Sequence, residues 1–310
     1  MTAQPGCVAR QNTCINVAGL IEAVHTAKVN TMPELPEVET MVRGIRDHLV
    51  GRQIQSTRFC RCYCKPIQIS PSKQKLRQAL RNSRIHAVQR LAKRIVITLD
   101  HSRSMVIEPR MTGLLLLTAP PTPAHRRIRW NLDPQPGLAD SFEFWDRRGL
   151  GTVRLFNQTE LAELRDQLGP DPLEMTPDQW AHQLARTRRA IKSALLDQHL
   201  VVGIGNIYAS EILHRAGISP ESPASSLSAE QIAQLAQTSS QILKDAIRYE
   251  GSTLGDGTYR NALNRQGGYQ NKHCVYQKEG ELCPTCRRGQ IRRIIQAQRS
   301  TFFCPRCQRT

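Results

Sequence analysis

The first residues of this chain that could do chemistry are a proline and a glutamate, in the segment Met32-Pro33-Glu34-Leu35-Pro36-Glu37. At a processed chain start, Pro33 would carry a free secondary amine, which is a good nucleophile towards the aldehyde carbon of a sugar. Inside a chain the same nitrogen is a tertiary amide whose lone pair is delocalised into the carbonyl, so it cannot attack. This chemistry therefore requires Pro33 to be an N-terminus.

Four cysteines near the other end of the chain have the spacing of a metal site. Cys283-Pro-Thr-Cys286 and Cys304-Pro-Arg-Cys307 are two pairs with 17 residues between them. Each pair can place two thiolates on one ion, and two pairs complete a tetrahedral zinc site, whereas a redox dithiol would need only one pair. We expect one structural Zn²⁺ that stiffens a hairpin between the pairs; it is not catalytic, because no ligand position stays open.

The other cysteines do not resemble a disulfide framework, because their spacing is irregular, and this points to a reducing interior. Cys60, Cys62 and Cys64 alternate and could form a metal cluster. Alternate residues of a strand also point to one face, and we favour ordinary strand thiols. Cys7, Cys14 and Cys274 have no matching partner pattern.

The charge of the chain indicates a polyanionic partner. There are 43 Lys and Arg residues against 26 Asp and Glu residues, a net charge of +17 spread along 310 residues. In a folded protein this balance favours nucleic acid over mere solubility. No apolar run approaches the roughly 20 residues of a membrane-spanning helix, and residues 1–31 do not have the pattern of a signal peptide.

Hydrophobic periodicity indicates the elements that would position these residues. Apolar residues recur at helical spacing from Leu35 to Leu49, and Gly51 ends the run. Many short β-type segments then follow, separated by polar or Pro/Gly stretches, which is typical of a sandwich or barrel. We expect strands at Ile54–Cys60, Ile85–Gln89, Arg94–Leu99, Ser104–Ile107, Leu114–Thr118, Ile128–Leu132, Phe142–Trp145 and Val153–Phe156.

From about Gln158 the pattern becomes helical. Thr176 and Ser228 each begin a capping box, and the second opens a helix to about Tyr249. Between them, Ala190–Gln198 and Asn206–Arg215 form two helices joined by a glycine-bearing double turn. From Gly251 to Lys272 the chain is rich in Gly, Asn and Gln, and we expect a mobile loop.

Three motifs in one order carry a family resemblance: MPELPEVET (Met32–Thr40), LVVGIGNIYASE (Leu200–Glu211) and AQRSTFFCPRC (Ala297–Cys307). Together they closely resemble the formamidopyrimidine-DNA glycosylase family of bacterial base-excision-repair enzymes. The resemblance implies an α+β multidomain fold: an N-terminal β-sandwich (32–157), a helical helix–two-turn–helix domain (158–272) and a C-terminal zinc-finger β-hairpin (273–310). Residues 1–31 would be a leader that is absent from the active protein.

The resemblance also implies a mechanism. The amine of Pro33 would attack C1′ of the damaged nucleotide, expel the base and leave an iminium that permits β- and δ-elimination. Glu34 would be the acid–base residue at the sugar ring. Lys93 would donate a proton during β-elimination; read without the resemblance, it is a surface cation. Arg299 would bind phosphates beside the lesion, where its rigid fork suits a phosphate better than lysine.

Further positions match the family's DNA-contacting residues. A glycosylase must flip the damaged base out of the duplex and fill the gap. Met111 and Arg148 match two void-filling residues, and Leu150 stands where the family usually has phenylalanine. Asn206, at a helix start, matches a phosphate-contact position, and His125 and Arg188 match further DNA-contact positions. Leu150 and the neighbouring departures Arg110, Thr112 and Arg147 leave the lesion preference and opposite-base discrimination open.

The expected protein is a monomeric DNA glycosylase and AP lyase that removes oxidised purines, namely 8-oxoguanine and formamidopyrimidines, from duplex DNA. It would also act on abasic sites, use no organic cofactor, and work in the bacterial cytoplasm at the nucleoid. If residues 1–31 are retained, the alternative is a non-catalytic binder of damaged DNA, and a weaker alternative is a zinc-ribbon RNA-binding protein. A start codon assigned too far upstream, or proteolysis, would account for the leader.

Overall fold

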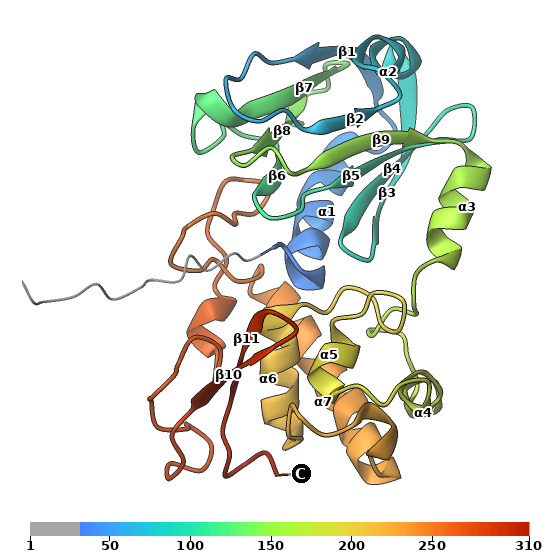
Figure 1. Cartoon of the computed structure of the whole chain (residues 1–310). Coiled ribbons are helices and arrows are strands. Elements are labelled where there is room, and N and C mark those ends of the chain that lie inside the picture. The colour runs from blue at the N-terminus through green and yellow to red at the C-terminus, as the bar shows by residue number, and fades with distance from the viewer. Residues whose placement is uncertain (1–31, 310) are drawn as a thin grey trace, which may run out of the picture. The chain divides into compact units, whose positions relative to one another are not determined.

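The computed structural model describes residues 32–309 (Figure 1). The expectations for residues 1–31, including Cys7 and Cys14, lie outside the described residues. Among the described helices, none is both long enough and apolar enough to cross a membrane.

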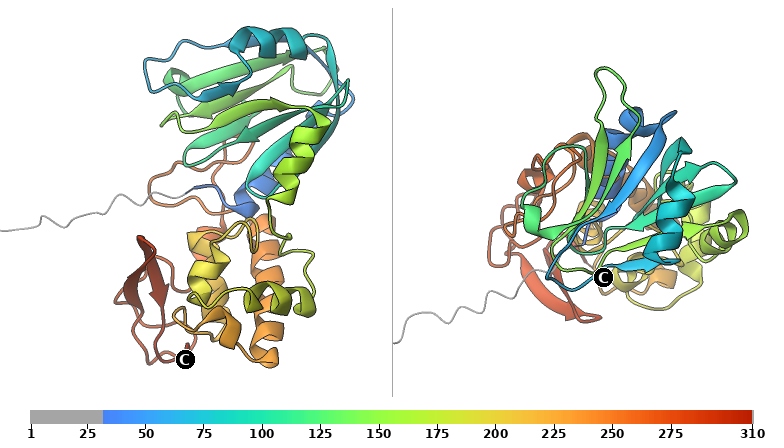
Figure 2. Two further views of the ribbon diagram at one scale, coloured as in Figure 1. Left: turned by 45° about the vertical axis from the view of Figure 1, so that its right-hand side comes forward. Right: turned by 90° about the horizontal axis from the view of Figure 1, so that it is seen from above.

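Helix α1 (Leu35–Leu49) follows directly after Pro33 and Glu34. The predicted apolar stripe is buried along its whole length, from Leu35 through Met41 to Leu49. Glu34 is the N-cap residue, and its backbone N–H donates to the Glu37 carboxylate at 3.0 Å. The helix lies between the strands of the N-terminal part and the helices that follow (Figures 1 and 2). This position brings the Pro33-Glu34 segment to the junction of the two parts.

The N-terminal part is built on one nine-stranded sheet with the order β2-β9-β5-β4-β3-β1-β7-β8-β6. Among the described strands, the two halves of the sheet join only where β1 pairs with β3, through two residue pairs. Side chains from both halves and from α1 pack into one core, so the predicted β-sandwich is confirmed. The strands are β1 (Gln53–Phe59), β2 (Gln68–Ser70), β3 (Ser83–Leu91), β4 (Arg94–Leu99), β5 (Arg103–Glu108), β6 (Gly113–Leu116), β7 (Arg126–Leu132), β8 (Ser141–Asp146) and β9 (Thr152–Phe156).

Two elements of this part were not predicted. Strand β2 has three residues and pairs in parallel with β9, and so short a segment carries no detectable alternation. Helix α2 (Lys73–Leu80) is only eight residues long and buries just Leu76 and Leu80. A third difference concerns the cysteines, because β1 ends at Phe59 and Cys60, Cys62 and Cys64 lie in the loop that follows. The prediction that these three cysteines lie in a strand was therefore wrong, although all three are free thiols.

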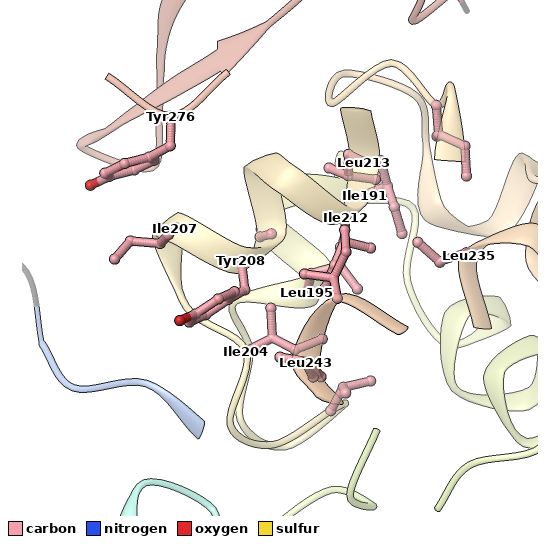
Figure 3. Close-up of a cluster of buried hydrophobic side chains, with 14 of the residues drawn as sticks. Ile191, Leu195, Ile204, Ile207, Tyr208, Ile212, Leu213, Leu235, Leu243 and Tyr276 are labelled. Atoms are coloured by element: carbon pink, nitrogen blue, oxygen red, sulfur yellow. The ribbon is translucent and has the colours of Figure 1, made fainter. Parts of the chain in front are cut away.

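The helical part consists of α3 (Gln158–Asp166), α4 (Pro177–Ala185), α5 (Ile191–Leu195), α6 (Asn206–Ala216) and α7 (Ala229–Arg248). Both predicted capping boxes are present: Thr176 Oγ1 accepts from the backbone of Gln179, and Ser228 Oγ accepts from that of Gln231. Helix α5 is shorter than expected and ends at Leu195. Apolar side chains of α5, α6 and α7 pack into a second core, which Figure 3 shows around Tyr208 and Leu243.

The C-terminal part contains the predicted hairpin, formed by β10 (Arg292–Gln296) and β11 (Arg299–Phe303) through five residue pairs. Ala297 and Gln298 make its two-residue turn with φ values of 46° and 59°, as a tight hairpin requires. The hairpin packs beside α6 (Figure 1).

The segment 251–272 is irregular, as expected, apart from the 3₁₀ turn Tyr269–Lys272. It is nevertheless bonded to α1, because the Tyr259 hydroxyl donates to the Glu37 carbonyl at 3.3 Å. Its predicted mobility stays a prediction.

Candidate active site and zinc site

The carboxylate of Glu34 lies at the N-terminus of α6. Its two oxygens accept backbone N–H bonds from Gly205 at 2.8 Å, Ile207 at 2.9 Å and Tyr208 at 3.3 Å. The first N–H groups of a helix have no partner within it, and the helix dipole favours negative charge there. The double turn before α6 therefore holds a carboxylate in one fixed position, directly after Pro33.

Two glycines of the double turn make this close approach possible. A Cβ on Gly205 would lie 2.5 Å from Oε1 of Glu34, which is too close for any side chain. Gly203 has a φ of +83°, and a Cβ there would lie 2.6 Å from Cδ1 of Leu35. The Gly203 carbonyl also accepts from the Leu35 backbone at 2.9 Å. The Gly-x-Gly spacing thus fits the double turn against the residues that follow Pro33.

Lys93 lies in the turn between β3 and β4 and is buried with Glu34 as a charged neighbour. Burial lowers the pKa of Lys93, and the negative charge of Glu34 opposes that shift. Burial likewise raises the pKa of Glu34, while Lys93 and the three backbone N–H groups lower it. Each of the two charges therefore stabilises the charged form of the other against the cost of burial.

A small pocket opens beside Pro33. Its walls include Met32, Pro33, Met111 and Ile207. Two predicted groups therefore meet here: the proposed nucleophile, and Met111, the first of the expected void-filling residues.

A buried polar network that includes two residues of the pocket wall, Glu37 and Ser252, was missed by sequence reasoning. Glu37 accepts from the Tyr208 hydroxyl at 2.6 Å and from the Ser252 backbone at 2.8 Å. The Ser252 hydroxyl in turn lies 3.0 Å from Nε2 of His273. Burial, reinforced by the charge of Glu34, raises the pKa of Glu37 to about 7. The sequence signals Glu37 only as a helix-capping residue, because its partners lie far along the chain.

Lys192, on α5, is a second buried cation that sequence reasoning missed. Its ammonium donates to Ser210 at 3.2 Å and to Thr301 at 3.1 Å. Burial lowers the pKa of Lys192 to about 7, with Glu34 raising it and Arg299 lowering it further. Arg299, exposed at the start of β11, also lowers the pKa of Lys93. The fold therefore brings Glu34, Lys93, Lys192 and Arg299 into electrostatic contact from separate elements.

The four predicted zinc ligands converge. The Sγ atoms of Cys283 and Cys307 are 3.7 Å apart, and those of Cys286 and Cys304 are 3.8 Å apart. A tetrahedron with Zn–S bonds of about 2.3 Å has edges of about 3.8 Å. A Cβ on Gly289 would lie 2.7 Å from the Cys304 Sγ, so glycine is needed for the chain to pass this close. The residues fit a closed Zn²⁺ site, and this prediction is confirmed.

The remaining predicted DNA contacts are spread over several elements. Arg148 is exposed and Leu150 half-buried in the loop after β8, where the Arg148 backbone donates to Thr112 Oγ1 at 2.9 Å. The Asn206 amide donates to the Ser300 carbonyl at 3.0 Å and so ties α6 to the hairpin. Arg188 is exposed before α5. His125 lies beside Cys64, a neighbour that the sequence did not indicate.

Family models match three segments of the chain. The formamidopyrimidine-DNA glycosylase N-terminal domain matches residues 32–153, and the formamidopyrimidine-DNA glycosylase H2TH domain matches residues 168–257. The zinc finger found in FPG and IleRS matches residues 280–310.

Individual relatives are similar over nearly their whole length. A formamidopyrimidine-DNA glycosylase of Chloroflexus aurantiacus is 41% identical, with 90% of this chain and 98% of that protein covered. One of Gluconobacter oxydans is 38% identical, with 90% and 100% covered.

Solved structures agree with this similarity. The MutM (Fpg) protein of Thermus thermophilus is 34% identical and superposes with a TM-score of 0.77, with 89% of this chain and 98% of that chain covered. The Lactococcus lactis Fpg in complex with abasic-site DNA is 30% identical, with a TM-score of 0.77 and 89% and 100% covered. Sequence, fold and zinc site agree, and the chain belongs to the formamidopyrimidine-DNA glycosylase family.

Proposed function

We propose that this protein is a base-excision-repair DNA glycosylase that removes oxidised purines from duplex DNA and then cleaves the strand by β- and δ-elimination. One observation carries the proposal: the carboxylate of Glu34 is fixed by three backbone N–H groups directly after Pro33, with the buried cation Lys93 beside it. An amine nucleophile and a positioned proton carrier are what C1′ substitution requires.

The nitrogen of Pro33 would attack C1′ and form a C–N bond while the bond from C1′ to the base breaks and the base leaves. The nitrogen then loses its proton, which the departing base can take up; its lone pair opens the sugar ring, and the ring oxygen takes a proton from Glu34. The resulting iminium draws electrons, so loss of a C2′ proton expels the 3′ phosphate and a second elimination expels the 5′ phosphate. An α-amino group titrates near pH 8, so an uncharged fraction is present at neutral pH.

Lys93 and Arg299 would serve the eliminations. Because burial lowers its pKa, Lys93 gives up a proton more readily than an exposed lysine does. Arg299 at the tip of the zinc-stiffened hairpin would hold the phosphates beside the lesion, and its fork can bind two oxygens at once. Zn²⁺ bound to the four cysteines would fix the hairpin and supply no chemistry of its own.

The other predicted residues would bind the distorted duplex. Met111 lines the pocket beside Pro33, where it would enter the gap left by the flipped nucleotide. Arg148 and Leu150 would fill the remaining space, and Asn206, Arg188 and His125 would contact phosphates. We place the protein in the bacterial cytoplasm, at the chromosome.

The active form must begin at Pro33, because a peptide-bonded proline nitrogen has no lone pair to donate. The test is borohydride trapping on duplex that contains 8-oxoguanine or an abasic site, with one chain that begins at Pro33 and one that retains residues 1–32. We expect a covalent adduct only with the first chain. No adduct with the chain that begins at Pro33 would refute the lyase mechanism.

A second candidate is a non-catalytic binder of damaged DNA. It is favoured by Met32, which is joined to Pro33 by a peptide bond and lines the same pocket. Mass spectrometry of the N-terminus in the native source separates the two candidates: a mature chain that retains Met32 supports the binder, and one that starts at Pro33 supports the enzyme.

A further inference from the structure

A second cluster of metal-binding side chains lies in the N-terminal part. Sγ of Cys64 is 3.2 Å from Nδ1 of His125, and the ligand atoms of Cys62, Cys64 and His125 all lie within 4.8 Å of one another. All three residues are partly exposed, so an ion can reach them from solvent. We propose that Cys62, Cys64 and His125 bind a second Zn²⁺ ion, separate from the four-cysteine site.

The geometry suits zinc with only a small adjustment. Zn–S bonds of about 2.3 Å and Zn–N bonds of about 2.0 Å place sulfur and nitrogen about 3.5 Å apart in a tetrahedron. The separation of 3.2 Å between Cys64 and His125 is close to this value. The loop can adjust because Tyr63, between the two cysteines, is fully exposed. Three protein ligands leave one position open, so this ion exchanges more readily than that of a closed site.

The third alternating cysteine, Cys60, does not belong to the cluster. Its backbone N–H donates to the Arg127 carbonyl at 2.9 Å, which holds it next to β7. Cys60 therefore offers a matched control: a cysteine two residues away that does not share the site.

Metal binding here would brace the loop that carries Arg148. Lys65 follows Cys64, and its carbonyl packs directly against Gly149. Arg127 connects the same two segments, donating to the Lys65 carbonyl at 2.9 Å and to the Asp146 carbonyl at 2.8 Å. An ion tied to Cys64 and His125 would thus stiffen the loop after β8, which under the proposed function enters the duplex.

The same ion would leave His125 able to contact DNA. A metal-bound imidazole donates from its other ring nitrogen. Bound through Nδ1, His125 would present an Nε2–H donor, which is what a phosphate contact needs. The predicted DNA contact and the metal site are therefore compatible.

The test is the zinc content of the full chain, purified with a phosphine reductant and measured by elemental analysis and native mass spectrometry. We expect two ions per chain in the wild type and in C60S, and one in C62S/C64S. H125Q should weaken the affinity for the second ion by at least the roughly 10–100-fold that loss of an outer-shell partner costs. One ion in the wild type, or two in C62S/C64S, would overturn the proposal, whether or not the protein proves to be a glycosylase.

Two further measurements separate zinc from other fates of the cysteines. Cobalt substitution should give a thiolate-to-metal absorption from both sites. C62S/C64S should lose the part of this absorption that Cys62 and Cys64 contribute. Hydrogen exchange at the backbone N–H groups of Arg148 and Gly151 should be faster in C62S/C64S than in C60S. A Cys62–Cys64 disulfide in the reduced preparation, detected by mass, would count against a metal site.

Discussion

The substitution Gly205→Ala should displace the carboxylate of Glu34 while it leaves the other groups of the site unchanged. The backbone of Gly205 is extended, with φ −129° and ψ −159°, so alanine can adopt it without strain. The new Cβ would lie 2.5 Å from Oε1 of Glu34, whereas ordinary contacts begin at 3.4 Å. The carboxylate must therefore retreat by about 1 Å, which stretches its 2.8 and 2.9 Å bonds to Gly205 and Ile207 beyond hydrogen-bond range.

The displacement of the Glu34 carboxylate sets the expected losses of reaction rate and of stability. A misplacement of about 1 Å at a reacting centre lowers the rate roughly 100-fold, which corresponds to about 2.7 kcal/mol of barrier. Overpacking should also lower the free energy of unfolding by about 1–3 kcal/mol. Gly268→Ala is the matched control, because its φ is −115° and its Cβ would meet only ordinary contacts at 3.5 Å and beyond.

The assay compares single-turnover borohydride trapping on 8-oxoguanine duplex with binding to duplex that contains a reduced abasic analogue. We expect Gly205→Ala to lose trapping while it keeps binding, and Gly268→Ala to retain both. If Gly205→Ala unfolds, Glu34→Gln replaces it: the side chain keeps its shape but cannot carry the proton, and the loss should be about 10²–10⁴-fold. A trapping rate for folded Gly205→Ala within a few-fold of the control would refute a fixed catalytic carboxylate at this position.

Three other outcomes follow from the site. Because burial raises the pKa of Glu37 to about 7, the folded state holds a proton that the unfolded chain releases near pH 4.5, so stability falls as pH rises between these values. In Glu37→Gln, the free energy of unfolding measured with urea should lose up to about 3 kcal/mol of this pH dependence. A free energy of unfolding with the same pH profile as the wild type would contradict this expectation. Removing zinc from the four-cysteine site should weaken duplex binding, reversibly on zinc addition, as anisotropy would detect. Arg299→Ala should reduce the slope of log affinity against log salt by about 1, while Arg299→Lys should keep the slope yet slow δ-elimination.

The features predicted correctly from sequence are those encoded within short segments. The two C-x-x-C pairs specify a zinc site by spacing alone, and the capping boxes at Thr176 and Ser228 specify helix starts by three-residue patterns. Glu34 was proposed as a site residue because it adjoins Pro33 in a recognisable motif, and its role stays a prediction. In the zinc site and the capping boxes, the residues that act together are also close in the chain.

The features that were missed depend on contacts between distant residues. Lys192 has an ordinary sequence context and becomes a buried cation only when Ser210 and Thr301 close around it. Cys64 and His125 are 61 residues apart, and their encounter depends on where β1 ends. Assigning Cys62 and Cys64 to a strand removed the geometric reason to connect them with any histidine. The sequence had suggested a metal cluster of alternating cysteines, and an error of a few residues at a strand end hid its histidine partner.

The contacts of Glu34 also explain why the start of the chain matters for chemistry. The acid is on the segment before α1, but the N–H groups that hold it belong to α6 and the turn before it, so docking of α1 builds the site. That docking buries Pro33 and places Met32 in the wall of the same pocket. Under the proposed mechanism, a preceding residue would block reaction twice: it turns the Pro33 nitrogen into an amide, and it takes up part of the pocket beside Pro33. Removing Met32 would free the lone pair and clear the pocket in a single cleavage, while the carboxylate of Glu34 is already in place.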